Sequence, residues 1–269
     1  MAAPKRFWHD LTSPEFRALD PVRTVAVLPI GATEQHGPHL AVSVDTTINE
    51  GVIARALALI PDDLPVLVLP TQAIGVSVEH ARFPGSLSLS PETAIAAWTE
   101  IGEAVAAAGV RKLLLFNSHG GQPQVAEIVC RRLRLRHGIF AATCLWNRLA
   151  PPAGLVAAEE LRLGIHAGQV ETALMLALAP DRVRMERARD FANSTAAWDG
   201  HALLRAGGAV AFGWQAGDLN PAGAVGAAAA ATAELGEAVL DRAGRALAAL
   251  LAELSALDAA AWLADAADA

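Results

Sequence analysis

The stretch that decides the fold is residues 25–45, with the sequence VAVLPIGATEQHGPHLAVSVD. Its first six residues are apolar, and a run of this kind predicts a buried strand of a parallel sheet. The run ends at Gly31, and four ionisable side chains follow it: Glu34, His36, His39 and Asp45. In open α/β sheets, ligands bind just beyond the carboxyl ends of the strands. The stretch therefore predicts a strand that leads into a divalent-metal site, with two ions.

The rest of the chain alternates between two apolar patterns. Solid apolar runs predict further strands at 66–69, 112–116 and 139–146, and helical spacing predicts helices at 45–60, 91–108, 124–136, 165–178 and 225–254. This alternation predicts an α/β fold, with a mainly parallel sheet covered by helices on both faces. We find no linker and no repeat, so we expect one domain over 1–269. The glycine-rich segment 180–225 is too long for a plain connection, and we expect a functional role or an oligomer contact there.

Composition excludes several classes of protein. The chain has 269 residues, 53% of them apolar, and a net charge of -7 without a long block of Lys or Arg, so we expect no nucleic-acid partner. No apolar run reaches the length of about 18 residues that a membrane span requires, and the N-terminus has no apolar signal segment. Cys130 and Cys144 lack the spacing of metal ligands. We therefore expect reduced cysteines and a cytoplasmic protein.

Imidazole and carboxylate groups recur where strands end. Glu34 and His36 are two residues apart, so in an extended segment they point the same way. Asp45 precedes a predicted helix and has two oxygens with which to bridge two cations, although helix capping is its ordinary role. His119 lies in the turn NSHGGQ (117–122), where glycines let the backbone approach a ligand. This donor set suits Zn, Mn or Fe better than Ca or Mg.

A second pair of candidates lies on the predicted helix 165–178. His166 and Glu171 are five residues apart, which is about 140° around a helix, so they are not an adjacent pair of ligands on one face. His166 is at the helix start, where it can project into a cleft. Glu171 has apolar neighbours and needs a partner, which is a metal ion or, alternatively, a buried ion pair.

Several segments together resemble the creatininase family of metal-dependent amidohydrolases. They are GATEQHGPHLAVSVDT (31–46), EHARFPGSLSLS (79–90), NSHGGQ (117–122), HAGQVETALML (166–176) and GDLNPAGAVGAAAAATAELGEAVLD (217–241). The resemblance implies a three-layer α/β/α sandwich and a binuclear centre of Zn or Mn, with Fe as a further option. It also implies hydrolysis of a non-peptide or cyclic C–N amide bond in a small molecule, by hexamers built as trimers of dimers.

The resemblance also implies roles for single residues. Glu34 and His119 would hold one ion, His36 would hold the other, Asp45 would bridge them, and His166 would shuttle a proton. One position departs from the pattern. Creatininase proper has a carboxylate two residues after the histidine that matches His119, and this chain has Gly121 there.

This departure leaves the second ion without a protein ligand at that position. Either Glu171, as ligand or as catalytic helper, or a water molecule would fill the gap. Creatinine becomes a doubtful substrate, and the chain resembles the broader HGG-type branch, whose members act on formamides, lactams and peptides. We expect the substrate pocket to include His39, His80, Gly120, Gly121 and Trp214.

Two other classes of function stay open from the sequence. A serine hydrolase would use Ser118 beside His119, but it needs a G-x-S-x-G elbow. The segment 75–79, GVSVE, comes nearest to that motif and fails at its last position. A binding module without catalysis would keep the pocket and lose the activity.

Overall fold

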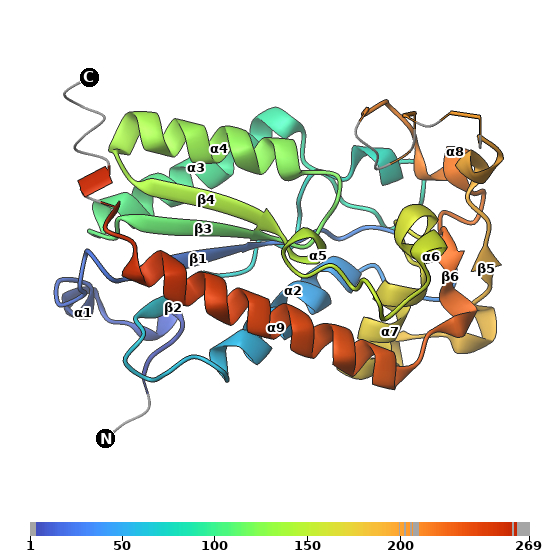
Figure 1. Ribbon diagram of the computed structural model, residues 1–269. Helices are drawn as coiled ribbons and strands as arrows, with labels where there is room; N and C mark the ends of the chain where they lie inside the picture. Colours follow the sequence, from blue (N-terminus) through green and yellow to red (C-terminus); the bar gives the residue numbers. More distant parts are fainter. Residues whose placement is uncertain are drawn as a thin grey trace.

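A parallel four-stranded sheet forms the centre of the protein (Figure 1). The computed structural model describes residues 4–198, 200–201, 203–204, 206, 210–259 and 261–262. The strand order is β2-β1-β3-β4, with bounds β1 (Val25–Ile30), β2 (Val66–Val68), β3 (Lys112–Asn117) and β4 (Phe140–Leu145). The four strands expected from the sequence are therefore confirmed, each within one residue at either end.

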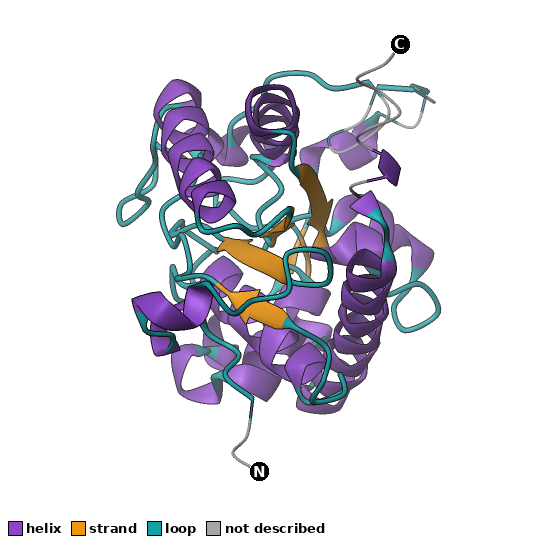
Figure 2. Ribbon diagram, turned by 90° about the vertical axis from the view of Figure 1, so that its left-hand side faces the viewer, coloured by secondary structure: helices purple, strands orange, loops and turns teal. Residues whose placement is uncertain are grey.

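Helices cover both faces of this sheet (Figures 1 and 2). One face carries α2 (Val44–Leu57), α7 (Gln169–Leu178) and α9 (Ala233–Ala256), and the other carries α3 (Pro91–Ala107) and α4 (Pro123–His137). Residues of β1 alternate between the two cores: Val25 and Val27 pack with the first group of helices, whereas Ala26 and Leu28 pack with the second. Because both faces are covered, every residue of β1 is buried, which explains its solid apolar run.

Shorter elements complete the described part of the chain. They are α1 (Ser13–Phe16), α5 (Trp146–Leu149), α6 (Ala158–Leu163), α8 (Ala216–Leu219) and the antiparallel pair β5 (Asp190–Phe191) and β6 (Gly226–Ala227). The 3-10 turns are η1 (Trp8–Asp10), η2 (Val78–His80), η3 (Pro180–Arg182), η4 (Met185–Arg187), η5 (Ser194–Ala197) and η6 (Ala228–Ala230). In its described part, the segment 180–225 contains three 3-10 turns, one short strand and one short helix, joined by irregular stretches.

Two predicted helices begin later than the sequence indicated. The helix expected at 225–254 starts at Ala233, because Gly226 has a φ of 118° and pairs with Phe191. Thr232 then caps the helix through a hydrogen bond from the amide of Leu235. The helix expected at 165–178 starts at Gln169, so His166 precedes it.

Two buried amide side chains fasten the segments at the carboxyl ends of the strands. Nδ2 of Asn49, from α2, donates to the carbonyl oxygens of Phe116 (2.9 Å) and Ile30 (3.3 Å). Nε2 of Gln122 donates to the carbonyl oxygen of Gly31 (3.1 Å), and its Oε1 accepts a hydrogen bond from the amide of Val76 (3.0 Å). The loops that follow β1, β2 and β3 are therefore tied to one another.

The sequence also predicted reduced cysteines and no membrane span. Cys130 and Cys144 are both free, and burial raises the pKa of each thiol to about 12. Both thiols are therefore protonated and unreactive near neutral pH. Among the described residues, no helix combines the length and apolar character needed to cross a bilayer.

Candidate metal centre

Titratable side chains from distant parts of the sequence meet just beyond the carboxyl ends of β1 and β3. Glu34 and His36 come from the loop after β1, and Asp45 lies in the first turn of α2. His119 follows β3, and Glu171 lies in the first turn of α7. These are the predicted metal ligands, and the structure brings all of them together.

Four groups of three side chains in the described part of the chain lie close enough to hold an ion, and Glu34 belongs to three of them. Two of the four groups share Asp45 and together contain all five predicted ligands, and we call these two the triads. In the first, Nδ1 of His119 lies 3.2 Å from Oε1 of Glu34 and 3.8 Å from Oδ2 of Asp45. In the second, Nε2 of His36 lies 4.0 Å from Oδ1 of Asp45 and 3.8 Å from Oε2 of Glu171. Asp45 thus turns one oxygen toward each triad, as a carboxylate between two cations would.

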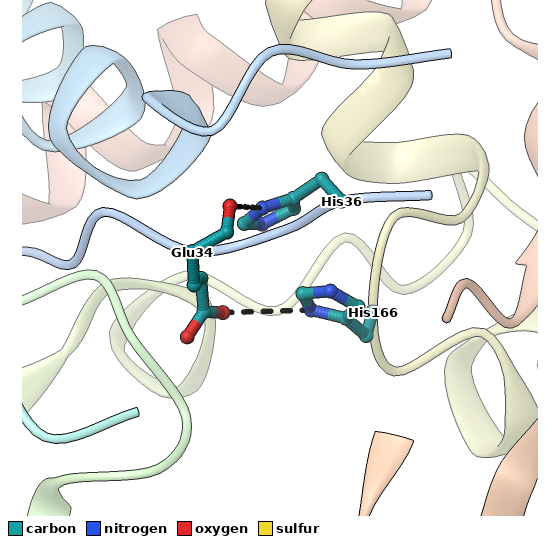
Figure 3. A group of neighbouring side chains, drawn as sticks. All are labelled: Glu34, His36 and His166. Atoms are coloured by element: carbon teal, nitrogen blue, oxygen red, sulfur yellow. Dashed lines mark hydrogen bonds and ion pairs between the residues drawn. The ribbon is translucent and has the colours of Figure 1, made fainter. Parts of the chain in front are cut away.

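Backbone carbonyls fix which ring nitrogen of each histidine faces the triads. Nδ1 of His36 donates to the carbonyl oxygen of Glu34 at 3.0 Å (Figure 3), so Nε2 carries the lone pair. Nε2 of His119 donates to the carbonyl oxygen of Val76 at 2.9 Å, so Nδ1 carries the lone pair. Histidines that bind metals are oriented in the same way, through a hydrogen bond from the other ring nitrogen.

Polar atoms inside the triads lack hydrogen-bond partners. Within the described part of the chain, these buried atoms include both carboxylate oxygens of Glu34, Nε2 of His36 and Oδ2 of Asp45. Such atoms are costly unless a partner satisfies them. Histidine lone pairs and carboxylate oxygens are all acceptors, so a bound cation satisfies them together. The residues therefore fit a divalent-metal centre.

The pKa shifts have the same electrostatic origin. Burial, followed by the charge of Glu34, raises the pKa of Asp45 well above its ordinary value, and burial raises the pKa of Glu171. Burial lowers the pKa of His36 well below its ordinary value. Burial opposes the charge of His119, but the carboxylates of Glu34, Glu79 and Asp45 outweigh it and raise the pKa of this imidazole. Excess negative charge at the cluster thus favours the uptake of either protons or cations.

His166 lies in the turn that precedes α7 and not in the helix itself. The backbone turns at Ala167, which has a φ of 53°, so His166 leaves the helix axis and its ring lies 4.2 Å from the ring of His36, centroid to centroid. Nε2 of His166 donates to the carbonyl oxygen of Gln35 (2.8 Å), and Nδ1 lies 3.7 Å from Oε1 of Glu34 (Figure 3). The prediction that His166 and Glu171 lie on one helix was wrong, because only Glu171 is helical. The two residues belong to different groups of possible ligands, as expected for residues that are not an adjacent pair.

Two residues at the centre were not identified from the sequence. Oε1 of Glu79 lies 3.4 Å from Nε2 of His119, beside the ring nitrogen that faces away from the triad. The amide nitrogen of Gln35 lies 2.8 Å from Nδ1 of His80, which leaves Nε2 of His80 to face Oε1 of Glu34 at 3.4 Å. The segment EHARFPGSLSLS contained Glu79, but nothing in its spacing distinguished this carboxylate from a surface one.

A cavity of about 430 Å³ opens onto the first triad. Its lining includes four residues predicted for the substrate pocket: His80, Gly120, Gly121 and Trp214. It also includes His166, predicted to transfer a proton, and the exposed Arg148. His39 is not among the described residues that line the cavity. It is buried behind the centre, where Nε2 bonds to Oγ1 of Thr172 (2.9 Å) and the ring stacks on Phe191.

Ser118 occupies a structural position. Its Oγ accepts a hydrogen bond from Nδ2 of Asn49 (3.1 Å) and donates to the carbonyl oxygen of Ile30 (3.4 Å). Neither partner is a general base, and the side chain is buried. These contacts disfavour the serine-hydrolase alternative, which requires a base beside the hydroxyl.

Comparison with known proteins supplies a family for this arrangement. The family model for creatininase, described as creatinine amidohydrolase, matches residues 9–251. The chain belongs to the creatininase family. The resemblance expected from the sequence motifs is therefore confirmed, and so is the fold, because the central parallel sheet with flanking helices matches solved creatininase structures.

Three individual proteins illustrate the similarity. Mycofactocin precursor peptide peptidase of Mycobacterium tuberculosis is 37% identical over 169 residues, which are 61% of this chain and 62% of that protein. The match thus spans less than two thirds of that relative's length. A manganese creatininase structure has a TM-score of 0.71 at 25% identity, covering 94% of this chain and 100% of that one. A mutant creatininase of the Zn–Zn type has a TM-score of 0.73 at 26% identity, covering 94% and 99%.

We predict that Gly121→Ala weakens divalent-metal binding. A Cβ at this position would overlap Oε1 of Glu79 and lie 2.5 Å from Nε2 of His119, so the imidazole must move. Disturbing the groups that orient a ligating histidine costs about 10- to 100-fold in metal affinity. Titration with Zn or Mn measures the effect. Gly120→Ala is the matched control, because its Cβ would meet no atom within 4 Å. Equal affinities in the two variants would contradict the prediction.

We also predict a contribution of His39 to the pH dependence of stability. Burial, with His166 nearby, lowers the pKa of His39 to about 4, against about 6.5 in an unfolded chain. Between these pH values the unfolded chain binds a proton that the folded chain does not, so the free energy of unfolding falls as pH falls from 6.5 to 4.

His39→Gln removes this contribution. The fall in the free energy of unfolding of the metal-free protein across that pH range should therefore be shallower in the variant than in the parent protein. Urea denaturation at a series of pH values measures both slopes. Identical slopes would show that His39 binds protons equally in the folded and unfolded states.

Proposed function

We propose that this chain is a metal-dependent amidohydrolase that uses two divalent ions, Zn or Mn, with Fe as a further option, to cleave a C–N amide bond of a small molecule. The bond we propose is a non-peptide or cyclic amide. One observation carries the proposal: the two oxygens of Asp45 face different triads. Oδ1 faces Nε2 of His36, and Oδ2 faces Nδ1 of His119. Membership in a family described as creatinine amidohydrolase supports the reaction class.

The two triads assign the proposed ligands. Glu34, Asp45 and His119 would hold one ion, and His36, Asp45 and Glu171 would hold the other. Glu171 thereby supplies the ligand that Gly121 cannot. When bound, ions of this kind polarise a substrate carbonyl and lower the pKa of a water molecule so that it attacks near neutral pH.

The proton transfer is assigned to His166. Its Nε2–H is held by the carbonyl oxygen of Gln35, so Nδ1 is the nitrogen that is free to take up a proton. His166 lines the cavity, with Nδ1 beside Glu34. A proton taken up at Nδ1 would be passed to the leaving nitrogen of the substrate, which is general acid catalysis by histidine.

A short peptide is the second candidate substrate. The relative that is 37% identical is named a peptide peptidase, and a cavity of about 430 Å³ is large enough for a drug-sized ligand. The chemistry of the metal centre is the same for both candidates.

The decisive experiment screens the purified protein, loaded with Mn or Zn, against lactams, ureides, formamides and short peptides. We expect hydrolysis of at least one class, loss of activity on chelation and recovery when the metal is restored. A serine-directed reagent should have no effect. Activity that survives metal removal and is lost with the serine reagent would overturn the proposal, and binding without turnover would indicate a binding module.

We predict that Asp45→Ala loses both ions, because Asp45 alone belongs to both triads. The parent protein should contain two ions per chain, and His36→Ala and His119→Ala should each retain one. Elemental analysis of the dialysed proteins measures these contents. Asp62→Ala, which removes an exposed carboxylate, is the control. Normal metal content in Asp45→Ala would contradict the bridging assignment.

Assembly, domain organisation and compartment remain proposals from the sequence and the family resemblance. We propose one domain, a homohexamer built as a trimer of dimers, a cytoplasmic location and no nucleic-acid or membrane partner. Light scattering on the protein as it elutes from a size-exclusion column measures the number of chains in the assembly.

A further inference from the structure

Glu160, on α6, is a buried carboxylate that belongs to neither triad. Its side chain is 8% exposed, and no Lys, Arg or His within the described ranges lies at ion-pair distance from it. Its two oxygens accept hydrogen bonds from two backbone amides instead: Oε1 from Gln169 at 2.7 Å and Oε2 from Ala227 at 2.9 Å. One carboxylate therefore joins the first residue of α7 to strand β6.

Three glycines pack closely around this carboxylate, which also lines the cavity beside the centre. Added Cβ atoms at Gly168 and Gly226 would lie 2.5 and 2.6 Å from Oε1 of Glu160, and one at Gly164 would overlap the same oxygen. Three glycines, two from the connection between α6 and α7 and one from β6, thus pack around one carboxyl group. An ordinary surface glutamate on a short helix does not require such close packing.

The two segments that Glu160 joins are those that hold His166. The carbonyl oxygen of His166 accepts a hydrogen bond from the amide of Val225 at 2.9 Å, two residues before Ala227. Gln169 follows His166 by three residues, across Ala167, whose φ of 53° is unfavourable for a residue with a side chain. The conformation of this turn persists only if its surroundings hold it on both sides.

We propose that Glu160 is a positioning residue that holds the turn 166–168 so that the imidazole of His166 faces Glu34 and the cavity. The proposal rests on the role given above to His166 as the group that transfers the proton. Glu160 acts through the backbone and has no part in binding the ions. It also caps the start of α7, where Gly168 offers no side chain for that purpose.

The experiment compares Glu160→Gln with Glu159→Gln, its exposed neighbour on α6. A glutamine keeps the shape, but in either orientation its NH₂ group opposes one of the two amides. We expect kcat to fall about 10- to 100-fold in Glu160→Gln, since a misplacement of about 1 Å costs up to about 100-fold. KM and metal content should be unchanged, and Glu159→Gln should match the parent protein.

A second pair of variants tests whether Glu160 acts through His166. In a His166→Ala background, Glu160→Gln should cost little further activity, because two residues that act through one group are not additive. An equal loss in both backgrounds would overturn the proposal. A raised KM with unchanged kcat would make Glu160 a substrate contact, and loss of metal would make it part of the centre.

Hydrogen exchange separates this proposal from the proposed function. The amides of Gln169 and Ala227 should exchange faster in Glu160→Gln than in the parent protein and in Glu159→Gln. This measurement needs no substrate, so it remains decisive if no amide on the screening panel is hydrolysed. Unchanged exchange at both amides would overturn the positioning role, whatever the activity.

Discussion

Two buried carboxylates, Glu34 and Asp45, and the partly buried carboxylate of Glu171 meet at the end of a parallel sheet, and the surrounding hydrogen bonds are arranged around their charge. Glu34, Asp45 and Glu171 face histidine nitrogens whose protons have been directed elsewhere. Acceptors that face one another in a buried site destabilise it unless a cation or protons intervene. The histidine N–H groups bond to backbone carbonyls, so the remaining histidine nitrogens and the carboxylate oxygens are all acceptors. A bound cation satisfies these acceptors together.

The supports of the centre are backbone groups and amide side chains. The carbonyl oxygens of Glu34 and Val76 fix the tautomers of His36 and His119. Gln122 links the loop after β1 to the loop after β2 by hydrogen bonds. The hydrogen bond of His36 joins residues two apart, whereas those of His119 and Gln122 join segments more than 40 residues apart in the chain. Hydrogen bonds of this kind fix the orientation of ligating side chains, and a fixed orientation favours both binding and catalysis.

The sequence predicted strand β1 correctly, because both of its faces are buried. It misplaced the start of helix α9, because the alanine-rich segment before that helix also has a helical composition. The run at 25–30 is apolar throughout because both faces of the sheet are covered, so it is recognisable without further information. The alanine-rich segment 225–232 has the composition of a helix, but Gly226 is held with a φ of 118° in a strand pair with Phe191. Pairing with a residue 35 positions away is invisible to local periodicity, and in this segment it outweighed helix propensity.

The sequence by itself determined the order of strands and helices, the family and the ligand types at the strand ends, because these follow from short-range patterns of polarity and from recognisable motifs. Tertiary structure alone decided which carboxylate stands near which imidazole. It brought Glu171 to His36, placed Glu79 over Gly121 and enclosed Glu160 among three glycines. The contacts of Glu171 with His36, Glu79 with Gly121 and Glu160 with Gly226 join segments far apart in the chain. Their geometry depends on how helices pack across the sheet, which no spacing along the sequence specifies.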